Sequence, residues 1–144
     1  MRKILFALVA LIVFAACGDK ASNEIPFEVA RNYFFRNDAE AQPTSPKITS
    51  EAEFNKYFGM AATMGEDGSP TEIDFSRQFV LAIVLPVTDY ATEINPVKLE
   101  ARGDTLVYTH EIKRGEKQTY SIQPISIIIV DKRHERQEIL LVAI

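Results

Sequence analysis

The chain has 144 residues, of which 47% are hydrophobic and 25% are charged, and its formal net charge is −4. This length fits about one ordinary domain, and the composition excludes a disordered, fibrous or low-complexity protein. Acidic residues outnumber basic ones and the basic residues form no stripe. This argues against nucleic acid as a partner, because such binding depends on neutralising phosphates.

The N-terminus has the pattern of a targeting segment. Arg2 and Lys3 precede an unbroken apolar run, Ile4–Phe14, which ends in two alanines before Cys17. With the alanines the run has 13 residues, well short of the roughly 20 that span a bilayer. An ordinary secretory signal cut after Ala16 is one interpretation. The other is a lipoprotein signal, because FAAC at this junction resembles a bacterial lipobox.

Cys17 favours the lipoprotein interpretation, since it is the only cysteine in the chain. A single unpaired thiol is a liability in an oxidising compartment, and a thioether-linked lipid removes it. We therefore predict a signal peptide over residues 1–16, a lipidated tether over 17–24 and a single domain over 25–144. Acyl chains contribute about 0.8 kcal/mol per buried methylene, so they anchor a protein without a transmembrane helix. By analogy with lipoprotein sorting, the non-acidic Gly18 favours the outer membrane.

The first segment of the domain has an ambiguous pattern. In IPFEVARNYFFRN, residues 25–37, apolar residues alternate with others, and the aromatic and β-branched content favours a strand. A helix over residues 28–36 is the alternative interpretation of this segment. If the segment is a strand, Tyr33-Phe34-Phe35 places rings on both of its faces, and one ring is exposed unless the strand is buried. Residues 39–47 follow as a loop with two prolines.

A short helix with an aromatic face is predicted next. Ser50-Glu51-Ala52-Glu53 is a capping box, in which the serine oxygen accepts from the amide of the last residue. Phe54, Tyr57 and Phe58 then share one face, and the helix ends near Gly59.

A loop is predicted to follow the helix over residues 59–72, with a weak helical turn over 60–64. Within it, residues 66–69 (EDGS) read as a turn, since they lack the regular oxygen ligands of a calcium loop.

The remainder of the chain is predicted to be β. Continuous apolar runs, which suit strands covered on both faces, occupy residues 79–85, 125–130 and 139–144. Residues 97–101 and 105–112 alternate around Gly103-Asp104, which predicts a hairpin. A second hairpin turn is predicted at Arg114-Gly115-Glu116, before residues 118–122, and a charged turn at 131–138 between the last two strands. The predicted fold class is α+β: a mainly antiparallel curved sheet or partial barrel with one short helix packed on it.

No motif for catalysis or metal binding is found. His110 lies in an alternating strand and His134 in a charged loop, and neither has a second histidine or a cysteine at metal-ligand spacing. Phosphate-binding, dinucleotide-binding, nucleophile-elbow and zinc-protease motifs do not occur. The basic residues within 132–136 read as a solvated hairpin tip rather than an anion site, because acidic neighbours offset them. We predict a non-catalytic chain without metal or cofactor.

A polar insert between strands, residues 86–96, is the candidate binding segment. Tyr90 offers a large contact area, and Asp89 and Glu93 can set polar specificity. A plain connection between strands is the alternative interpretation of this segment.

A family resemblance adds to this interpretation. ITSEAEFNKYFG, then TEIDFSRQFVLAIVLP and later YSIQPISIIIVDK together resemble the C-terminal domain of the PrcB-like accessory subunits of protease complexes. The resemblance covers residues 48–132. Where family members carry Gly-Gly-Tyr, this chain reads TDYATEI and shares only Tyr90. The resemblance implies a non-catalytic envelope domain that binds or stabilises a protein.

Two functional hypotheses follow from the sequence. The first is a lipid-anchored cell-envelope accessory module that binds a protease or another envelope protein. The second is a small-molecule-binding or hydrolytic protein with a cleft near residues 86–96. A deep pocket with converging polar groups at this segment would favour the second hypothesis, and a flat or convex surface the first.

Overall fold

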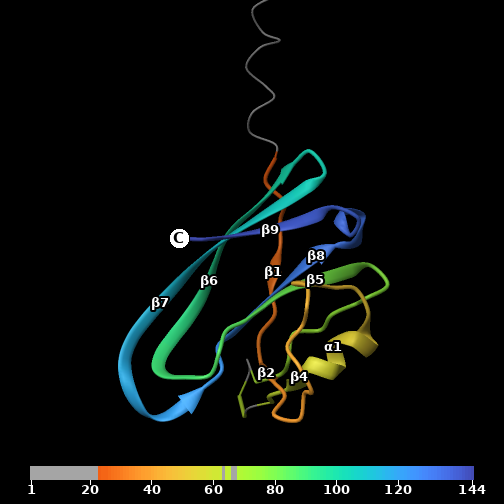
Figure 1. The fold of residues 1–144 in the computed structure, drawn as a ribbon. Coiled ribbons are helices and arrows are strands. Elements are labelled where there is room, and N and C mark those ends of the chain that lie inside the picture. The colour runs from red at the N-terminus through yellow and green to blue at the C-terminus, as the bar shows by residue number, and fades with distance from the viewer. Residues whose placement is uncertain (1–22, 63, 66–67) are drawn as a thin grey trace, which may run out of the picture.

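Two sheets pack face to face, and a small layer that contains the helix covers the outer face of one of them (Figure 1). The computed structural model describes residues 23–62, 64–65 and 68–144. The four-stranded sheet has the order β1 (Glu28–Val29), β8 (Ile125–Asp131), β5 (Gln78–Val84), β3 (Lys47–Ile48). The three-stranded sheet has the order β6 (Thr88–Arg102), β7 (Thr105–Ile122), β9 (Glu138–Ala143). The small layer consists of β2 (Tyr33–Phe35), β4 (Phe58–Met60) and α1 (Glu51–Tyr57).

The central strands β5 and β8 are buried on both faces. In β5, Phe79 and Leu81 belong to the core shared with the three-stranded sheet, whereas Val80 and Ala82 belong to the core under α1. Successive side chains of a strand point to opposite faces, so a strand covered on both sides reads as a continuous apolar run. The prediction for residues 79–85 and 125–130 is confirmed.

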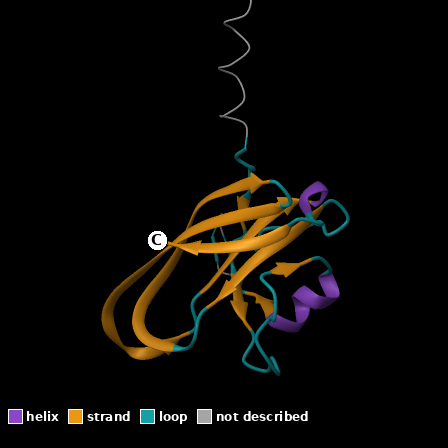
Figure 2. Cartoon of the chain, turned by 45° about the horizontal axis from the view of Figure 1, so that its top comes forward, coloured by secondary structure: helices purple, strands orange, loops and turns teal. Residues whose placement is uncertain are grey.

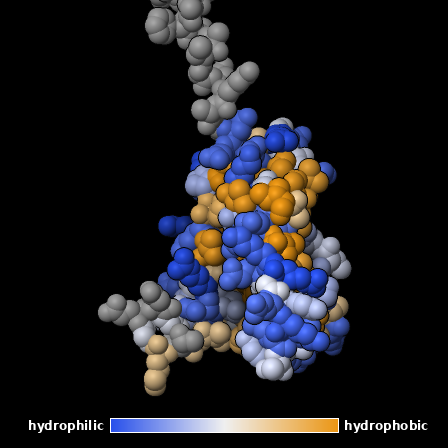
Figure 3. Space-filling model, turned by 90° about the vertical axis from the view of Figure 1, so that its left-hand side faces the viewer, coloured by the Kyte–Doolittle hydropathy of each residue, from blue (hydrophilic) through white to orange (hydrophobic). Residues whose placement is uncertain are grey.

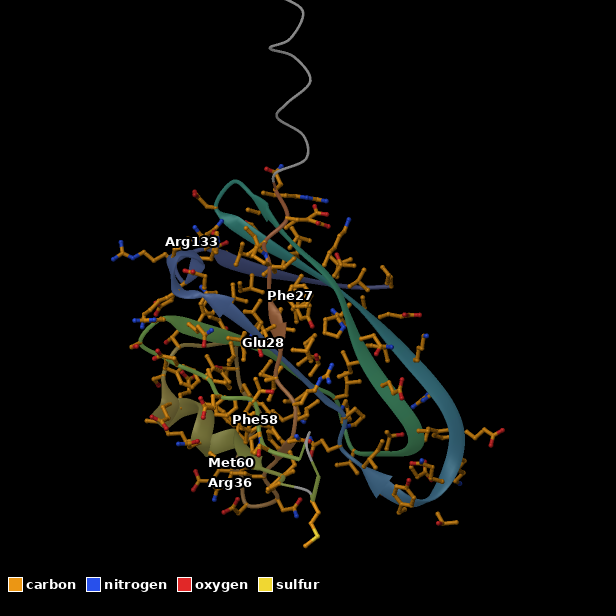
Figure 4. All side chains as sticks on the ribbon, turned by 180° about the vertical axis from the view of Figure 1, so that it is seen from behind. Phe27, Glu28, Arg36, Phe58, Met60 and Arg133 are labelled. Atoms are coloured by element: carbon orange, nitrogen blue, oxygen red, sulfur yellow. The ribbon has the colours of Figure 1, made fainter. Side chains whose placement is uncertain are left out.

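The helix α1 forms as its sequence predicts. The Ser50 side chain accepts a hydrogen bond from the amide of Glu53, which satisfies one of the free N–H groups of the first turn. Phe54 and Phe58 are buried, and the chain leaves the helix at Phe58 to begin β4. Figure 4 shows Phe58 within the body and Arg133 pointing away from it. The aromatic side of the helix thus holds it against the four-stranded sheet.

The segment before the helix is extended rather than helical. β1 pairs with β8 and β2 pairs with β4, so the strand interpretation of residues 25–37 is confirmed in two short pieces and the helical alternative is wrong. Asn32, between the two strands, has a φ of 65°, a conformation that asparagine tolerates better than most residues. The predicted loop 59–72 starts late, because Gly59 and Met60 belong to β4. The predicted turns at 60–64 and 66–69 include residues 63, 66 and 67, which lie outside the described residues.

The hairpin between β6 and β7 is confirmed at Gly103-Asp104. Arg102 pairs with Thr105 across a two-residue loop, and Gly103 has a φ of 60°. A positive φ at the first of two turn residues is typical of a type II′ turn, in which glycine avoids the strain of a side chain.

The C-terminal strand β9 differs from its prediction. It pairs with β7 in parallel and lies at the edge of the three-stranded sheet, so it is not covered on both faces. Residues 131–138 therefore carry the chain from one sheet to the other, through the short 3-10 helix η2 (Lys132–His134), and do not form a hairpin tip (Figure 2). Apolar surface is visible on the side of the molecule toward which β9 ends (Figure 3), and Leu140, Leu141 and Ile144 are exposed.

The fold class is α+β, with curved, mainly antiparallel sheets and one short α-helix packed on them. Among the strands of the described residues, β7 and β9 pair in parallel and the other pairs are antiparallel. The sheets do not close into a barrel.

Candidate functional site

A two-stranded ribbon extends from the sandwich, and we call it the arm: Thr88–Asn95 of β6 and Glu111–Ile122 of β7. Figure 1 shows it curving away from the body at the end of the molecule opposite the Gly103 turn. The strand β9 ends opposite His110, so beyond that point neither edge of the ribbon pairs with another described strand. Side chains project from both of its faces (Figure 4), and most residues from Ile112 to Ser121 are exposed. The β7 side of the arm is thus open to solvent beyond His110.

The candidate binding segment 86–96 is mostly strand, so its prediction as a connecting insert is wrong. Residues from Thr88 onward pair with β7. The pairing brings acidic residues of β6 beside basic residues of β7: Asp89 lies 3.5 Å from the ammonium of Lys117, and Glu93 is the partner of Lys113 in the register. Opposite charges across a strand pair stabilise the pairing by a few tenths to about 1 kcal/mol.

The second predicted hairpin turn, at Arg114-Gly115-Glu116, is also wrong. These residues lie within β7 at a bulge. Between the pairs Tyr90–Lys117 and Thr92–Arg114, β6 has one residue, Ala91, whereas β7 has two, Gly115 and Glu116. A Cβ atom at Gly115 would lie 3.2 Å from the Cβ of Ala91. The glycine therefore permits a close approach of the two strands at a bulge, which is a common role of glycine in strands.

Tyr90 is held in place on the arm but remains accessible. Its ring is covered on one side by the guanidinium of Arg114, 4.9 Å from the ring centre, and the residue is 38% exposed. Its amide donates to the hydroxyl of Thr88, and its carbonyl accepts from the hydroxyl of Thr92. Large aromatic side chains that are fixed before binding lose little entropy when a partner covers them. The structure thus brings Asp89, Tyr90 and Glu93 together on one strand, each next to a β7 cation.

A hollow of about 320 Å³ lies beside the root of the arm. Arg114 is the only charged residue that lines it, and the other lining residues are Leu85, Pro86, Val87, Thr88, Thr92, Ile112 and Pro124. Asp89, Tyr90 and Glu93 do not line it. The three candidate residues therefore lie on an open ribbon and do not converge on this hollow.

A larger groove of about 620 Å³, between α1 and residues 69–75, was not predicted from the sequence. Aromatic and acidic side chains line it, including Phe54, Phe75 and Glu72. The Tyr33 hydroxyl donates to the carbonyl of Thr71 at 2.5 Å, and burial, followed by the nearby Glu72, raises the pKa of this phenol. The groove combines α1 and residues 69–75 with Tyr33, which is 38 residues from its partner Thr71, so no local pattern could have indicated it.

The Asp-Phe-Ser motif of the family resemblance forms a turn at the entry to β5. Asp74 accepts hydrogen bonds from the amide and the hydroxyl of Ser76, and these bonds lower the pKa of its carboxyl group. Its own carbonyl accepts from the amides of Arg77 and Gln78. The motif therefore has a structural role that explains its spacing.

The two histidines lie in different surroundings. His134 is half-buried in η2, where its Nδ1 lies 2.8 Å from the side-chain oxygen of Gln137. His110 is buried between the sheets against the ring of Tyr108. Within residues 23–62, 64–65 and 68–144, no three His, Cys, Asp or Glu side chains are grouped so that they could hold a metal ion.

The predicted lipid attachment residue, Cys17, lies outside the described residues, as does the whole predicted signal peptide. In the described part of the chain, no helix has the length and hydropathy required to cross a membrane.

Comparison with known proteins found no matching family model, no matching curated protein and no matching solved structure.

Proposed function

We propose that the chain is a lipid-anchored, non-catalytic accessory module of the bacterial cell envelope, most consistent with the outer membrane, that binds a protein partner through its arm. The observation that carries this proposal is the arm itself: a ribbon on which Tyr90 is hydrogen-bonded to Thr88 and Thr92, lies against Arg114 and stays 38% exposed. Fixed aromatic residues on open surfaces are typical anchors of protein interfaces.

The position of the tether supports the same proposal. Asn23 accepts a hydrogen bond from the amide of Ala101, near the Gly103 turn, whereas Thr88 lies at the other end of β6 (Figure 1). Residues 18–22 reach at most about 20 Å from a lipid on Cys17. The tether therefore holds the turn near the membrane and presents the arm at the far end of the domain.

The partner class follows from the sequence. The resemblance to PrcB-like subunits indicates a protease complex or another envelope protein rather than a small molecule. The candidate residues also fit a protein better than a small ligand, because they lie along an open strand and do not line the hollow of about 320 Å³ beside it.

The experiment is quantitative capture from solubilised membranes with the full-length protein as bait. Truncation of a central tyrosine anchor typically costs about 2 kcal/mol of binding, or about 30-fold in affinity. We expect Tyr90→Ala to lose the captured protein while its Tm stays within a few degrees of wild type, because an exposed cation–π contact contributes only about 0.5–1 kcal/mol. Met60→Ala, which truncates an exposed residue on β4, is the control and retains capture. Equal capture by both variants would contradict binding through the arm.

A further inference from the structure

The body ends and the arm begins at His110, where three structural changes coincide. β9 forms its last pair there, with Ala143 opposite His110. β6 has a bulge at Val97, between its pairs with His110 and Thr109. β7 passes from five buried residues, 106–110, through the half-buried Glu111 to the exposed residues of the arm. His110 is therefore the junction residue of the two parts.

The His110 ring is enclosed without a polar partner for one of its nitrogens. The residue is 4% exposed, its ring centre lies 5.5 Å from that of Tyr108, and its Nδ1 has no hydrogen-bond partner. Buried polar atoms without a partner are uncommon in native structures and call for an explanation. Such a ring is tolerated when it is neutral, whereas a charged imidazolium at the same place would lack both water and a counter-ion.

The side chains that stack on or pair with His110 carry no charge that would offset that cost. Tyr108 is the titratable side chain in contact with it, and burial raises the pKa of this phenol, which stays neutral. From the neighbouring strands, Pro96 of β6 and Ala143 of β9 are its pairing partners, and neither carries a charge. The nearest charged residue of β6 in the register, Lys98, pairs with Thr109 and forms its ion pair with Glu100. Among the described residues no carboxylate forms an ion pair with His110.

We propose that His110 is a pH-sensitive latch, whose protonation opens the junction and releases the arm and the end of β9 from the body. The opening is local because few interactions fix the arm and the end of β9 to the body. Beyond His110 the arm contributes few buried side chains, and the amide of Ile144 donates its hydrogen bond to the carbonyl of His110 itself. Regions with few buried contacts open at lower free energy than the core, so hydration of the imidazolium does not require global unfolding.

The sign of the effect follows from burial. Desolvation lowers the pKa of His110 below its ordinary value of 6.5, against a smaller opposing effect of the Tyr108 backbone. The open state therefore binds more protons than the closed state below about pH 6.5. The latch is fully closed above that pH and loosens progressively as the pH falls toward the lowered pKa of the closed state. The proposal concerns the junction and does not depend on what the arm binds.

Amide hydrogen exchange at pH 7.5 and 5.5, corrected for intrinsic rates, tests the proposal on the full chain. We expect amides of Glu111–Lys117 and Val142–Ile144 to lose at least about tenfold of their protection at pH 5.5, while β5 and β8 keep theirs. His110→Gln, which cannot take up a proton, should show no such loss. His134→Gln, which changes the other histidine, should behave as wild type. Protection that is equal at the two pH values, lost equally in β5 and β8, or still lost in His110→Gln would overturn the proposal.

A second measurement covers the case in which His110→Gln fails to fold. The imidazole resonances of the unmodified protein distinguish the two histidines when compared with His134→Gln. We expect the His110 resonance to titrate below pH 6.5 and the arm amides to shift with the same midpoint. Titration of His110 at or above pH 6.5, or arm amides that do not follow it, would contradict the latch.

Discussion

Phe54 lies where α1, β2 and the loop before β5 meet, and its ring contacts three others. The ring centres of Tyr33, Phe58 and Phe75 lie 5.2, 5.0 and 5.7 Å from that of Phe54. Tyr33 belongs to β2, Phe58 to β4 and Phe75 to the segment before β5. The Phe54 side chain therefore holds the elements of the small layer together and packs them on the four-stranded sheet. The sequence identified this residue correctly, because a capping box followed by aromatics at helical spacing is a local pattern.

Truncation of this ring should be costly. We expect Phe54→Ala to lower the free energy of unfolding by about 3–5 kcal/mol, since a cavity remains among aromatic rings that cannot all move into it. Ser50→Ala should cost only about 1 kcal/mol, because it removes a single capping hydrogen bond, from the amide of Glu53. Denaturant unfolding of the two variants measures both values. Equal, small losses would mean that the helix contributes little to the stability of the domain.

At the scale of elements, the sequence predicted those strands correctly whose burial determines the pattern of their own residues. β5 and β8 are apolar at successive positions because both of their faces are covered, and this pattern is visible without the fold. The run at 139–144 has the same pattern but forms an edge strand with exposed leucines. A continuous apolar run therefore identified a strand in all three cases but its position in a sheet in only two.

The arm could not be predicted from local pattern, because its partners are remote. Thr88–Asn95 is polar and lacks an apolar face, so it reads as a connection until its pairing with residues 111–122 is known. Gly115 reads as a turn residue for the same reason, although its role is to let Ala91 approach. The candidate residues Asp89, Tyr90 and Glu93 lie on one accessible strand, and their role in binding stays a prediction. Their cationic neighbours on β7 were missed.

At the scale of the whole molecule, the first described residue, Asn23, and the arm lie at opposite ends of the domain (Figure 1). Asn23 enters beside Ala101 near the Gly103 turn, and β6 runs from there to Thr88. An extended strand of this length spans up to about 45 Å, and its curvature shortens this distance. The arm is therefore the end of the described chain farther from Asn23, where the predicted tether enters.

The anchor itself is tested by Cys17→Ser. Without the thiol, no thioether lipid forms, and we expect the protein to be released from membranes and to lose metabolic labelling with a fatty acid. Fractionation of the wild-type protein should place it mainly in the outer membrane. A variant that stays membrane-bound, together with an unlabelled wild type, would show that the lipoprotein prediction is wrong, and a wild type found mainly in the inner membrane would contradict only the sorting prediction.

The central claim, that the arm is the binding surface of an anchored module, is tested most directly by site-specific photo-crosslinking in intact cells. A photoreactive side chain at Glu93 reports on the arm, and one at Glu72 reports on the groove beside α1; both positions are exposed. The account predicts a dominant protein adduct from position 93 that disappears in the Cys17→Ser background, and no comparable adduct from position 72. Adducts formed only from position 72, or equally from both positions, would contradict it.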